Sequence, residues 1–258
     1  MRISEFIELN SNGLTYMSSP NISAAHAFTT RHGGASLGIY SSLNLSQSAG
    51  DELNNVKENY ALLCKTLGID VRDIVCNSQV HGTDIRIVTK EDTGKLFEQG
   101  IPKADGLITN SHGVALMVFS ADCVPILLHD PVKDVIGAVH AGWRGTASNI
   151  VGCAIDKMET AFSCKRSDIR AAIGPCISKC CFETDDDVAS VLPNVSTKCG
   201  DKYMVDLKES NMLSLEKAGV YDIIISNECT SCSSNKYWSH RKTKGKRGTQ
   251  AALITLVC

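Results

Sequence analysis

The chain has 258 residues, of which 43% are hydrophobic and 21% charged, and its formal net charge is −2. The length allows a substantial core, and the balanced charge gives no global basic field for binding a nucleic acid. The longest apolar runs, 114–121 and 135–141, are far shorter than the roughly 20 residues of a membrane span, and the N-terminus lacks the apolar segment of a signal peptide, so we expect a cytoplasmic protein.

The first half of the chain is predicted to contain short strands and one helix. Residues 1–50 form short strands and turns that end in the loop 29–36. A helix is predicted over 51–67, because apolar residues recur there with helical spacing and Gly68 follows as a stop. Beyond the helix, we expect strands at 74–80 and 85–88 around the turn 81–84, a loop or short helix at 90–103, and a strand at 104–109.

The second half of the chain is predicted to contain both apolar strands and helices. The predicted strands are 114–119, 126–129, 135–139, 169–173, 223–226 and 251–257. The predicted helices are 147–162, 185–192 and 207–218. No internal repeat or low-complexity linker interrupts the chain. We therefore expect one continuous α/β or α+β domain over residues 1–258.

Three side chains, which we call the triplet, each lie in a polar motif beside an apolar run: His81, Cys123 and His140. Two imidazoles and one thiolate suit zinc, and three protein ligands with an open fourth position are typical of a catalytic zinc. Gln79 or Asp84 could orient the His81 imidazole. The alternatives without a functional role are that His81 is a surface histidine and Cys123 a core cysteine. The spacing of the triplet along the chain matches no generic zinc pattern.

Two of these motifs carry further polar groups. Asp122 ends a buried strand, where a carboxylate without a role would be costly. Around Trp143 and Arg144, two glycines suggest backbone that passes close to a ligand, and the guanidinium could recognise an anion. A simple strand-to-helix turn, capped by Thr146 or Ser148, is the alternative.

Twelve cysteines are many for a chain without a signal peptide, and we expect mostly reduced, buried thiols. Cys229-Thr230-Ser231-Cys232 is a CxxC motif, and Cys180-Cys181 lies elsewhere in the chain. Together they could form a second, structural zinc site or a redox pair. Reduced structural thiols are the interpretation that the sequence favours.

Motifs along the whole chain resemble the multicopper polyphenol oxidase or laccase-domain family, also called purine nucleoside phosphorylases of the YfiH and FAMIN type. They are Thr30-Arg31-His32-Gly33-Gly34, Tyr40-Ser41-Ser42-Leu43-Asn44-Leu45, Gln79-Val80-His81-Gly82, Ala104-Asp105-Gly106-Leu107-Ile108-Thr109, Ala121-Asp122-Cys123, Val139-His140-Ala141-Gly142-Trp143-Arg144-Gly145-Thr146, Ile173-Gly174-Pro175-Cys176-Ile177 and Ser239-His240-Arg241-Lys242. They are specific in combination and in order.

The resemblance implies a single domain of mixed β-sandwich character flanked by helices, similar to the cytotoxic necrotizing factor-like cysteine hydrolases. It also implies zinc held by the triplet, with phosphorolysis of adenosine, inosine, guanosine and methylthioadenosine and a companion adenosine deaminase activity. The older family name implies copper and phenol oxidation. A single set of three ligands such as the triplet cannot hold the several copper ions of a laccase, although one cupric ion could bind there.

The motifs also suggest roles for individual residues. The triplet carries the catalysis, with Asp122 as the proton donor and Asp84 as the second choice. For phosphate we expect Arg31 and Arg241, with Arg144 third. Asn44 and Gln79 complete the residues expected to bind substrate. The partners are then a purine nucleoside and phosphate, without nucleic acid or membrane, and the protein is a monomer or a homodimer.

One segment departs from the family. The family has Thr-Gly-Arg before its last strand, whereas this chain has Arg247-Gly248-Thr249. If the family arginine contacts phosphate, Arg247 or Lys246 could replace it. Besides the copper oxidase, the rival activity is a cysteine hydrolase with Cys123 as nucleophile and His140 as its base. A non-catalytic scaffold would leave the polar cluster unexplained.

Overall fold

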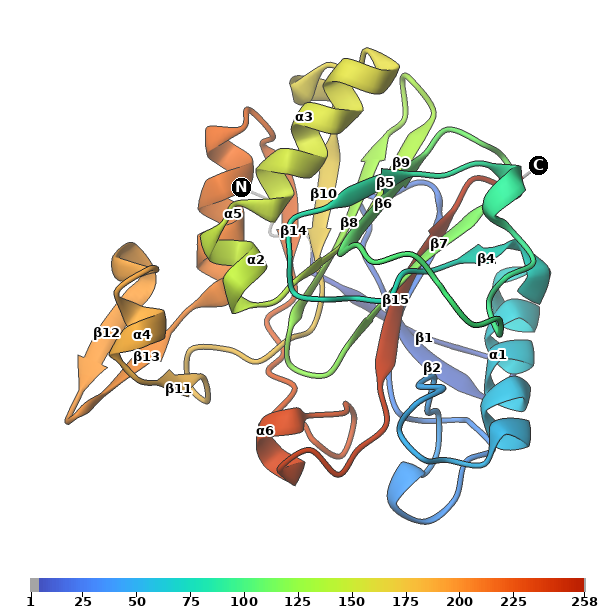
Figure 1. The fold of residues 1–258 in the computed structure, drawn as a ribbon, viewed down its shortest axis with the longest axis horizontal. Coiled ribbons are helices and arrows are strands. Elements are labelled where there is room, and N and C mark those ends of the chain that lie inside the picture. The colour runs from blue at the N-terminus through green and yellow to red at the C-terminus, as the bar shows by residue number, and fades with distance from the viewer. Residues whose placement is uncertain (1–4, 258) are drawn as a thin grey trace.

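Two six-stranded sheets form the centre of the molecule (Figure 1). The computed structural model describes residues 5–257, so residues 1–4 of the expected N-terminal strand region lie outside it. The strands of the first sheet are, in spatial order, β1 (Ile7–Ser11), β2 (Leu14–Ser18), β3 (Ala25–Thr29), β15 (Gln250–Thr255), β7 (Ala115–Ser120) and β4 (Ile74–Val75). Those of the second are β14 (Asp222–Ile225), β10 (Arg170–Ile173), β8 (Val124–Asp130), β9 (Val135–Ala141), β6 (Gly106–Thr109) and β5 (Ile85–Ile87).

The two sheets pack face to face through alternating side chains of their central strands. Leu116 and Val118 of β7 point into the same cluster as Leu127 of β8 and Ile136 of β9. The intervening residues, such as Met117, turn to the opposite face. Because both faces of these strands are buried, their sequences are continuous apolar runs. Both sheets are mixed, since β4–β7, β5–β6 and β10–β14 are parallel pairs and the other pairs are antiparallel.

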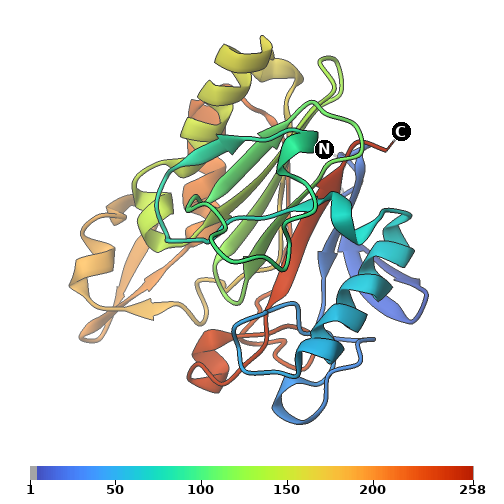
Figure 2. The ribbon, with the colours of Figure 1, turned by 45° about the vertical axis from the view of Figure 1, so that its right-hand side comes forward.

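Helices cover the two outer faces of this sandwich (Figure 2). Helix α1 (Leu53–Leu67) packs Val56, Tyr60 and Leu63 on the first sheet, and it ends at the left-handed Gly68. The helices α2 (Trp143–Ala147), α3 (Ile150–Phe162) and α5 (Leu207–Lys217) lie against the second sheet. The order of layers is therefore helix, sheet, sheet, helix, which confirms the expected mixed α+β class with a β-sandwich flanked by helices.

Smaller elements complete the described chain. A three-stranded sheet, β11 (Glu183–Thr184), β13 (Lys202–Val205) and β12 (Ser196–Cys199), projects from one side together with α4 (Asp186–Ala189) (Figure 1). Helix α6 (His240–Thr243) precedes β15. Short 3-10 turns lie at Gly38–Tyr40, Val71–Asp73, Lys90–Asp92, Arg166–Asp168 and Pro193–Val195. No helix within residues 5–257 is long and apolar enough to cross a bilayer.

Three expected elements differ from the structure, and three strands were not expected. The strand expected at 74–80 is regular only over Ile74–Val75. Beyond it, Ser78 forms an isolated bridge with Lys103, and Gln79 bonds β7 through its side chain. The helix expected at 147–162 is two helices, because Asn149 between them is left-handed, with φ 59°. The helix expected at 185–192 covers only Asp186–Ala189. The strands β11, β12 and β13 were not predicted, since their sequences are polar and half exposed.

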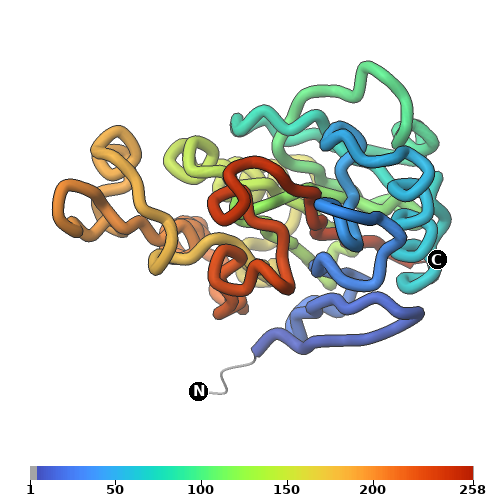
Figure 3. Tube along the Cα trace, turned by 90° about the horizontal axis from the view of Figure 1, so that it is seen from below, coloured from blue at the N-terminus to red at the C-terminus, as the bar shows by residue number. Residues whose placement is uncertain are grey.

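Connecting segments that are far apart in the sequence meet at one end of the sandwich (Figure 3). The backbone N–H of Arg31 donates to the carbonyl of Lys236, and that of Leu45 donates to the carbonyl of Thr249. The connection 121–123 crosses from β7 in the first sheet to β8 in the second. Most of the residues singled out from the sequence lie on these connections, so this end of the molecule is the candidate site.

Candidate functional site

The structure brings the triplet together. His81 follows the irregular segment after β4, Cys123 lies between β7 and β8, and His140 lies near the end of β9. The antiparallel register of β8 and β9 pairs Pro125 with His140, which places the preceding Cys123 beside the end of β9. One ligand atom from each triplet residue lies within 4.8 Å of the other two. The two imidazole centroids are 4.9 Å apart, at an interplanar angle of 83°.

Gly142 makes this close approach possible. A Cβ atom placed on Gly142 would lie 2.6 Å from Cδ2 of His81 and 3.5 Å from Sγ of Cys123. Carbon atoms do not approach each other to 2.6 Å without a clash, so any larger residue here would displace the imidazole. The sequence suggested Gly142 as a point where the backbone approaches another group closely. In the structure, that group is the His81 side chain.

A buried carboxylate, Asp105, organises two members of the triplet. Its Oδ1 accepts from Nδ1 of His140 at 2.9 Å and from the backbone N–H of His81 at 2.9 Å. Its Oδ2 accepts from the backbone N–H groups of Val80 and Gly82 at 3.1 and 2.7 Å. Asp105 has no exposed surface. It thus fixes the left-handed turn at His81, where φ is 61°, and directs the other nitrogen of His140 toward Cys123.

Protonation within the triplet is strongly coupled. Burial opposes ionisation of Cys123, but hydrogen bonds and charge from His140 and His81 outweigh it and lower the pKa of the thiol to about 6. Burial would also lower the pKa of His140, whereas its hydrogen bonds with Asp105 and Cys123 raise it to about 9. Without a metal ion, the pair therefore favours a thiolate beside an imidazolium.

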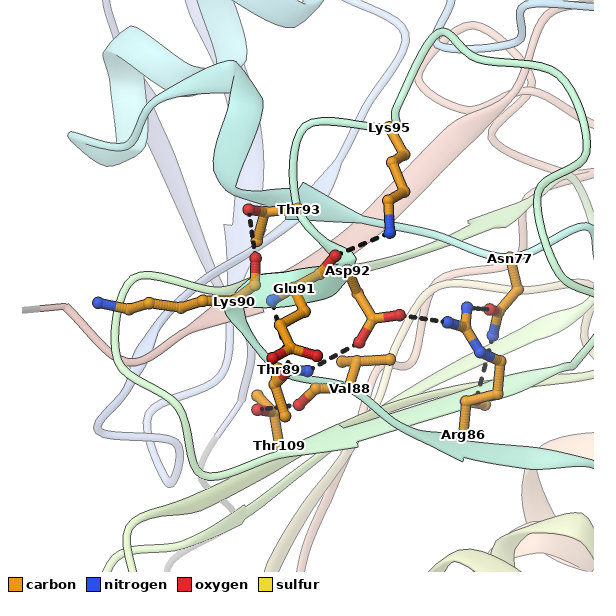
Figure 4. A network of polar contacts seen from close by, with 11 residues as sticks. Asn77, Arg86, Val88, Thr89, Lys90, Glu91, Asp92, Thr93, Lys95 and Thr109 are labelled. Atoms are coloured by element: carbon orange, nitrogen blue, oxygen red, sulfur yellow. Dashed lines mark hydrogen bonds and ion pairs between the residues drawn. The ribbon is translucent and has the colours of Figure 1, made fainter.

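The segment that leads to His81 is held by side chains rather than by a strand ladder. The amide of Gln79 donates to the carbonyl of Phe119 at 2.8 Å and accepts from its N–H at 2.7 Å. Asn77 donates to the carbonyl of Gly106 and accepts from Arg86, which also pairs with Asp92 (Figure 4). The Gln79 amide is therefore bound to β7 rather than to the His81 imidazole. The exposed Asp84 carboxylate makes no hydrogen bond to His81 in the described structure.

Asp122 faces away from the triplet. Its Oδ1 accepts from the hydroxyl of Thr230 at 2.6 Å, and its Oδ2 accepts from the backbone N–H of Arg241 at 2.7 Å. Its backbone is in a positive-φ conformation, with φ 91°. The carboxylate thus fixes the turn that presents Cys123. Both carboxylate oxygens already accept hydrogen bonds from the protein, and the proton-donor role expected from the sequence stays a prediction.

Three residues expected to bind substrate are engaged elsewhere. Asn44 is fully buried, and its amide bonds Asp51 and the N–H groups of Ser46 and Thr249. The guanidinium of Arg31 donates to the carbonyls of Ser41 and Ser234 and lies over the Trp238 ring. That of Arg241 donates to the carbonyls of Cys181 and Glu183. These side chains hold loops together, which the sequence could not distinguish from anion binding.

Two other arginines keep guanidinium donors that make no hydrogen bond within residues 5–257. Arg144 is exposed and lies over the Trp143 ring, 4.1 Å from its centroid. Arg247 lies close enough to Asp122 and Cys123 for both to raise its pKa, although burial lowers it more. Its Nε is buried without a hydrogen-bond partner among residues 5–257. Sequence reasoning named Arg247 only as a replacement for the displaced family arginine.

A pocket of about 640 Å³, within the range of small-molecule sites, is lined by segments that lead to the triplet, although no triplet residue lines it. Its lining includes Gln79 and Phe119, which precede members of the triplet, and Thr249. The hydroxyls of Thr249 and Ser120 are buried without partners among the described residues. Ser120 pairs with Gln250 across β7 and β15, and Thr249 immediately precedes β15, so the two free hydroxyls lie on neighbouring segments. A polar ligand could satisfy such groups.

The donor set fits zinc. Two imidazole nitrogens and a thiolate are ligands that zinc prefers, and three of them leave one coordination position open. Apart from the triplet, the described residues contain one other cluster of possible ligands, and it consists of four cysteines without histidine. The several histidine-rich copper centres of a laccase therefore have no counterpart within residues 5–257.

Comparisons with known proteins match most of the chain. The purine nucleoside phosphorylase YlmD of Geobacillus stearothermophilus is 40% identical over 250 residues, covering 91% of each chain. The purine nucleoside phosphorylase of Deinococcus radiodurans is 36% identical over 95% of this chain and 94% of its own. The crystal structure of YlmD from Geobacillus stearothermophilus matches 98% of this chain and 100% of its own, with a TM-score of 0.93 and 36% identity. The multi-copper polyphenol oxidoreductase laccase family matches residues 25–257, and the chain therefore belongs to this family.

Proposed function

We propose that the protein is a zinc-dependent purine nucleoside phosphorylase with a companion adenosine deaminase activity. The observation that carries the proposal is the convergence of the triplet, together with a pocket of nucleoside size lined by the segments that lead to it. The names of the relatives supply the substrate class, because YlmD and the Deinococcus radiodurans protein are both called purine nucleoside phosphorylases. The proposed substrates are adenosine, inosine, guanosine and methylthioadenosine.

In this proposal His81, Cys123 and His140 hold the zinc. A zinc ion held there supplies Lewis acidity toward an oxygen atom of the substrate or of water. Asp105 keeps both histidines in position through the His140 ring and the His81 backbone. Asp122 is a positioning residue that fixes the Cys123 turn. We assign phosphate to Arg247 and Arg144, because neither guanidinium is fully used by the protein.

Phosphorolysis requires a bound anion close to the sugar. A phosphate oxygen forms a bond to C1′ of the ribose while the bond from C1′ to the purine nitrogen breaks, and the proton of hydrogenphosphate ends on the base. The products are the free purine and ribose 1-phosphate. Arg247 would bind phosphate from a site that is largely desolvated, where charge-assisted hydrogen bonds are strong. The pocket lined by Gln79, Phe119 and Thr249 would hold the nucleoside.

Deamination uses water in place of phosphate. The water oxygen adds to the purine carbon that carries the amino group. One proton joins the departing ammonia, and the other ends on the neighbouring ring nitrogen. This reaction needs no phosphate-binding arginine. The two activities can therefore be separated by a change at Arg247 alone.

The test is to incubate the zinc-loaded protein with adenosine and with inosine, with and without phosphate, and to separate the products by chromatography. Phosphate-dependent release of free base and ribose 1-phosphate is the expected result. The Cys123→Ala variant should lose zinc at this site and activity together, whereas Cys199→Ala, at an exposed position on β12, should lose neither. Full phosphorolysis by the Cys123→Ala variant would refute the assignment.

A second candidate rests on a specific observation. The Cys123 thiol lies within 4.8 Å of a ring nitrogen of His140, whose Nδ1 donates to Asp105, and this order of thiol, imidazole and carboxylate is the arrangement of a cysteine nucleophile with its base. As a hydrolase, the protein would be inactivated by thiol alkylation and would stay active in the presence of a chelator. Inactivation by the chelator, with recovery on addition of zinc, excludes this candidate.

A further inference from the structure

Four cysteines outside the triplet form a second cluster. Cys180 and Cys181 lie between β10 and β11, and Cys229 and Cys232 lie in the CxxC segment after β14. Their four sulfur atoms all lie within 4.8 Å of one another. We call these residues the thiol cluster. The sequence left its role open and favoured independent reduced thiols.

The distances match those of a metal-bound tetrahedron of sulfur atoms. The Sγ of Cys232 is 3.4 Å from that of Cys181 and 3.6 Å from that of Cys180, and the last two are 3.8 Å apart. Sulfur atoms about 2.3 Å from a central zinc ion would be about 3.8 Å apart. A disulfide requires about 2.05 Å, so these pairs are not bonded to one another.

Packing alone does not explain the cluster. A free cysteine normally gathers with others in the core, where it behaves as a small apolar residue. Here Cys180 and Cys232 are exposed and only Cys229 is buried. Thiols are weak hydrogen-bond donors and acceptors, so their mutual contacts give little stabilisation at a solvated position. Four sulfur atoms from two distant segments need another reason to converge.

The backbone around the cluster is arranged as it is around a metal-bound thiolate. The Sγ of Cys229 accepts from the backbone N–H of Ser178 at 3.3 Å. A backbone donor directed at a sulfur favours its anionic form. The two segments are also joined directly, since Cys176 and Cys229 form a parallel bridge and the Thr230 N–H donates to the Cys176 carbonyl at 3.0 Å.

We propose that Cys180, Cys181, Cys229 and Cys232 bind a structural zinc ion. Four thiolates close the coordination shell, which distinguishes this site from the open triplet. The ion would clamp two loops that both touch Asp122: the Ile177 N–H donates to the Asp122 carbonyl at 2.9 Å, and Thr230 donates to its carboxylate. The clamp therefore lies behind the turn that presents Cys123. This proposal does not depend on the proposed activity.

Zinc content of purified full-length variants tests the proposal. We expect two zinc ions per chain in the wild type and in the Cys199→Ser control, one in Cys123→Ser, and one in the double variant Cys229→Ser, Cys232→Ser. If the triplet does not bind zinc, wild type and Cys123→Ser should both hold a single ion that the double variant lacks. In that case only the proposed function fails. A folded Cys123→Ser variant without zinc would overturn the thiol-cluster site, and iron in place of zinc would overturn the choice of ion.

A second measurement covers the case in which the double variant does not fold. Cobalt loaded into Cys123→Ser should give the intense sulfur-to-metal absorption of a tetrathiolate centre, because the thiol cluster is intact in that variant. With zinc bound, the four cysteines should react with N-ethylmaleimide far more slowly than the exposed Cys199, as followed by mass spectrometry. Absence of the cobalt spectrum, equal alkylation rates, or disulfides within the cluster would each contradict the proposal.

Discussion

Asp105 shows how much of the site depends on a single side chain. Its two oxygens accept from one imidazole and three backbone N–H groups, and so connect β6, the His81 turn and β9. The hydrogen bond from Nδ1 of His140 leaves the other ring nitrogen free for a metal. Metal-binding histidines commonly have such a carboxylate partner, and its loss typically weakens metal affinity or activity 10- to 100-fold.

Asp105→Asn should therefore lower zinc affinity at the triplet by about 10- to 100-fold, with a comparable loss of activity. The amide keeps the size of the carboxylate, but its NH₂ group faces backbone donors. Competition with a zinc-binding dye measures the affinity. Asp84→Asn is the matched control, because that side chain is exposed and makes no hydrogen bond within residues 5–257. Unchanged affinity in Asp105→Asn would remove the orienting role.

Arg247 carries a second expectation at this scale. Arg247→Gln should raise the KM for phosphate and reduce phosphorolysis by tenfold or more, because a charge-assisted contact contributes about 1.5–3 kcal/mol. Deamination of adenosine should stay near the wild-type rate, since it uses no phosphate. Lys246→Gln, at an exposed neighbouring position, should change neither activity. If both activities of Arg247→Gln fall together, the arginine does not act through phosphate.

At the scale of the elements, the sequence predicted what local patterns determine. The strands around β7, β8 and β9 are buried on both faces, and their apolar runs located them. Helix α1 followed from its spacing and from Gly68. Segments held by distant partners were not predictable, since Gln79 replaces a strand ladder by bonding Phe119, 40 positions away. Asp105 lies within one of the family motifs, but nothing in the neighbouring sequence indicates that its carboxylate is hydrogen-bonded to His140.

The break between α2 and α3 is a testable case. Asn149 has φ 59° and ψ 44°, a conformation that asparagine and glycine adopt more readily than other residues. Asn149→Ala should destabilise the protein by about 1 kcal/mol, whereas Asn149→Gly should change its stability by a few tenths at most. Urea unfolding followed by circular dichroism compares the two variants. Equal stabilities would mean that the left-handed turn is not what separates the helices.

For the whole molecule, the sandwich is a rigid frame with its chemistry at one end. Both sheets contribute through the segments that join or extend their strands, and the connection 121–123 belongs to both. The core between the sheets is apolar, so few ionisable groups lie inside it. One of them, His26 on β3, couples the stability of the frame to pH.

His26 should make the protein less stable in mild acid. Burial lowers its pKa, and the hydrogen bond from Nδ1 to the Ala24 carbonyl only partly offsets this effect. Nε2 accepts the Ser19 N–H at 2.8 Å and cannot take a proton without losing that bond. The unfolded chain, with a pKa of 6.5, therefore binds more protons. The free energy of unfolding is highest above this pH and falls as the pH drops below it.

Urea unfolding between about pH 7.5 and pH 5 measures this dependence. His26→Gln should lose less stability over the range than the wild type. The neighbouring His129 also has a lowered pKa and should account for part of the remaining slope. His112→Gln serves as the control, because the exposed His112 pairs with Asp134, which raises its pKa and gives the opposite sign. Parallel curves for His26→Gln and wild type would exclude the contribution of His26.

The place of β15 has a consequence for biosynthesis. This strand, residues 250–255, lies between β3 and β7 in the middle of the first sheet. While the ribosome is still translating the preceding segment, β3 and β7 have no partner between them, and their edges can pair with other chains. The first sheet therefore closes only after residue 255 has emerged from the ribosome. Until then, the nascent chain is at its most vulnerable to aggregation and most dependent on chaperones.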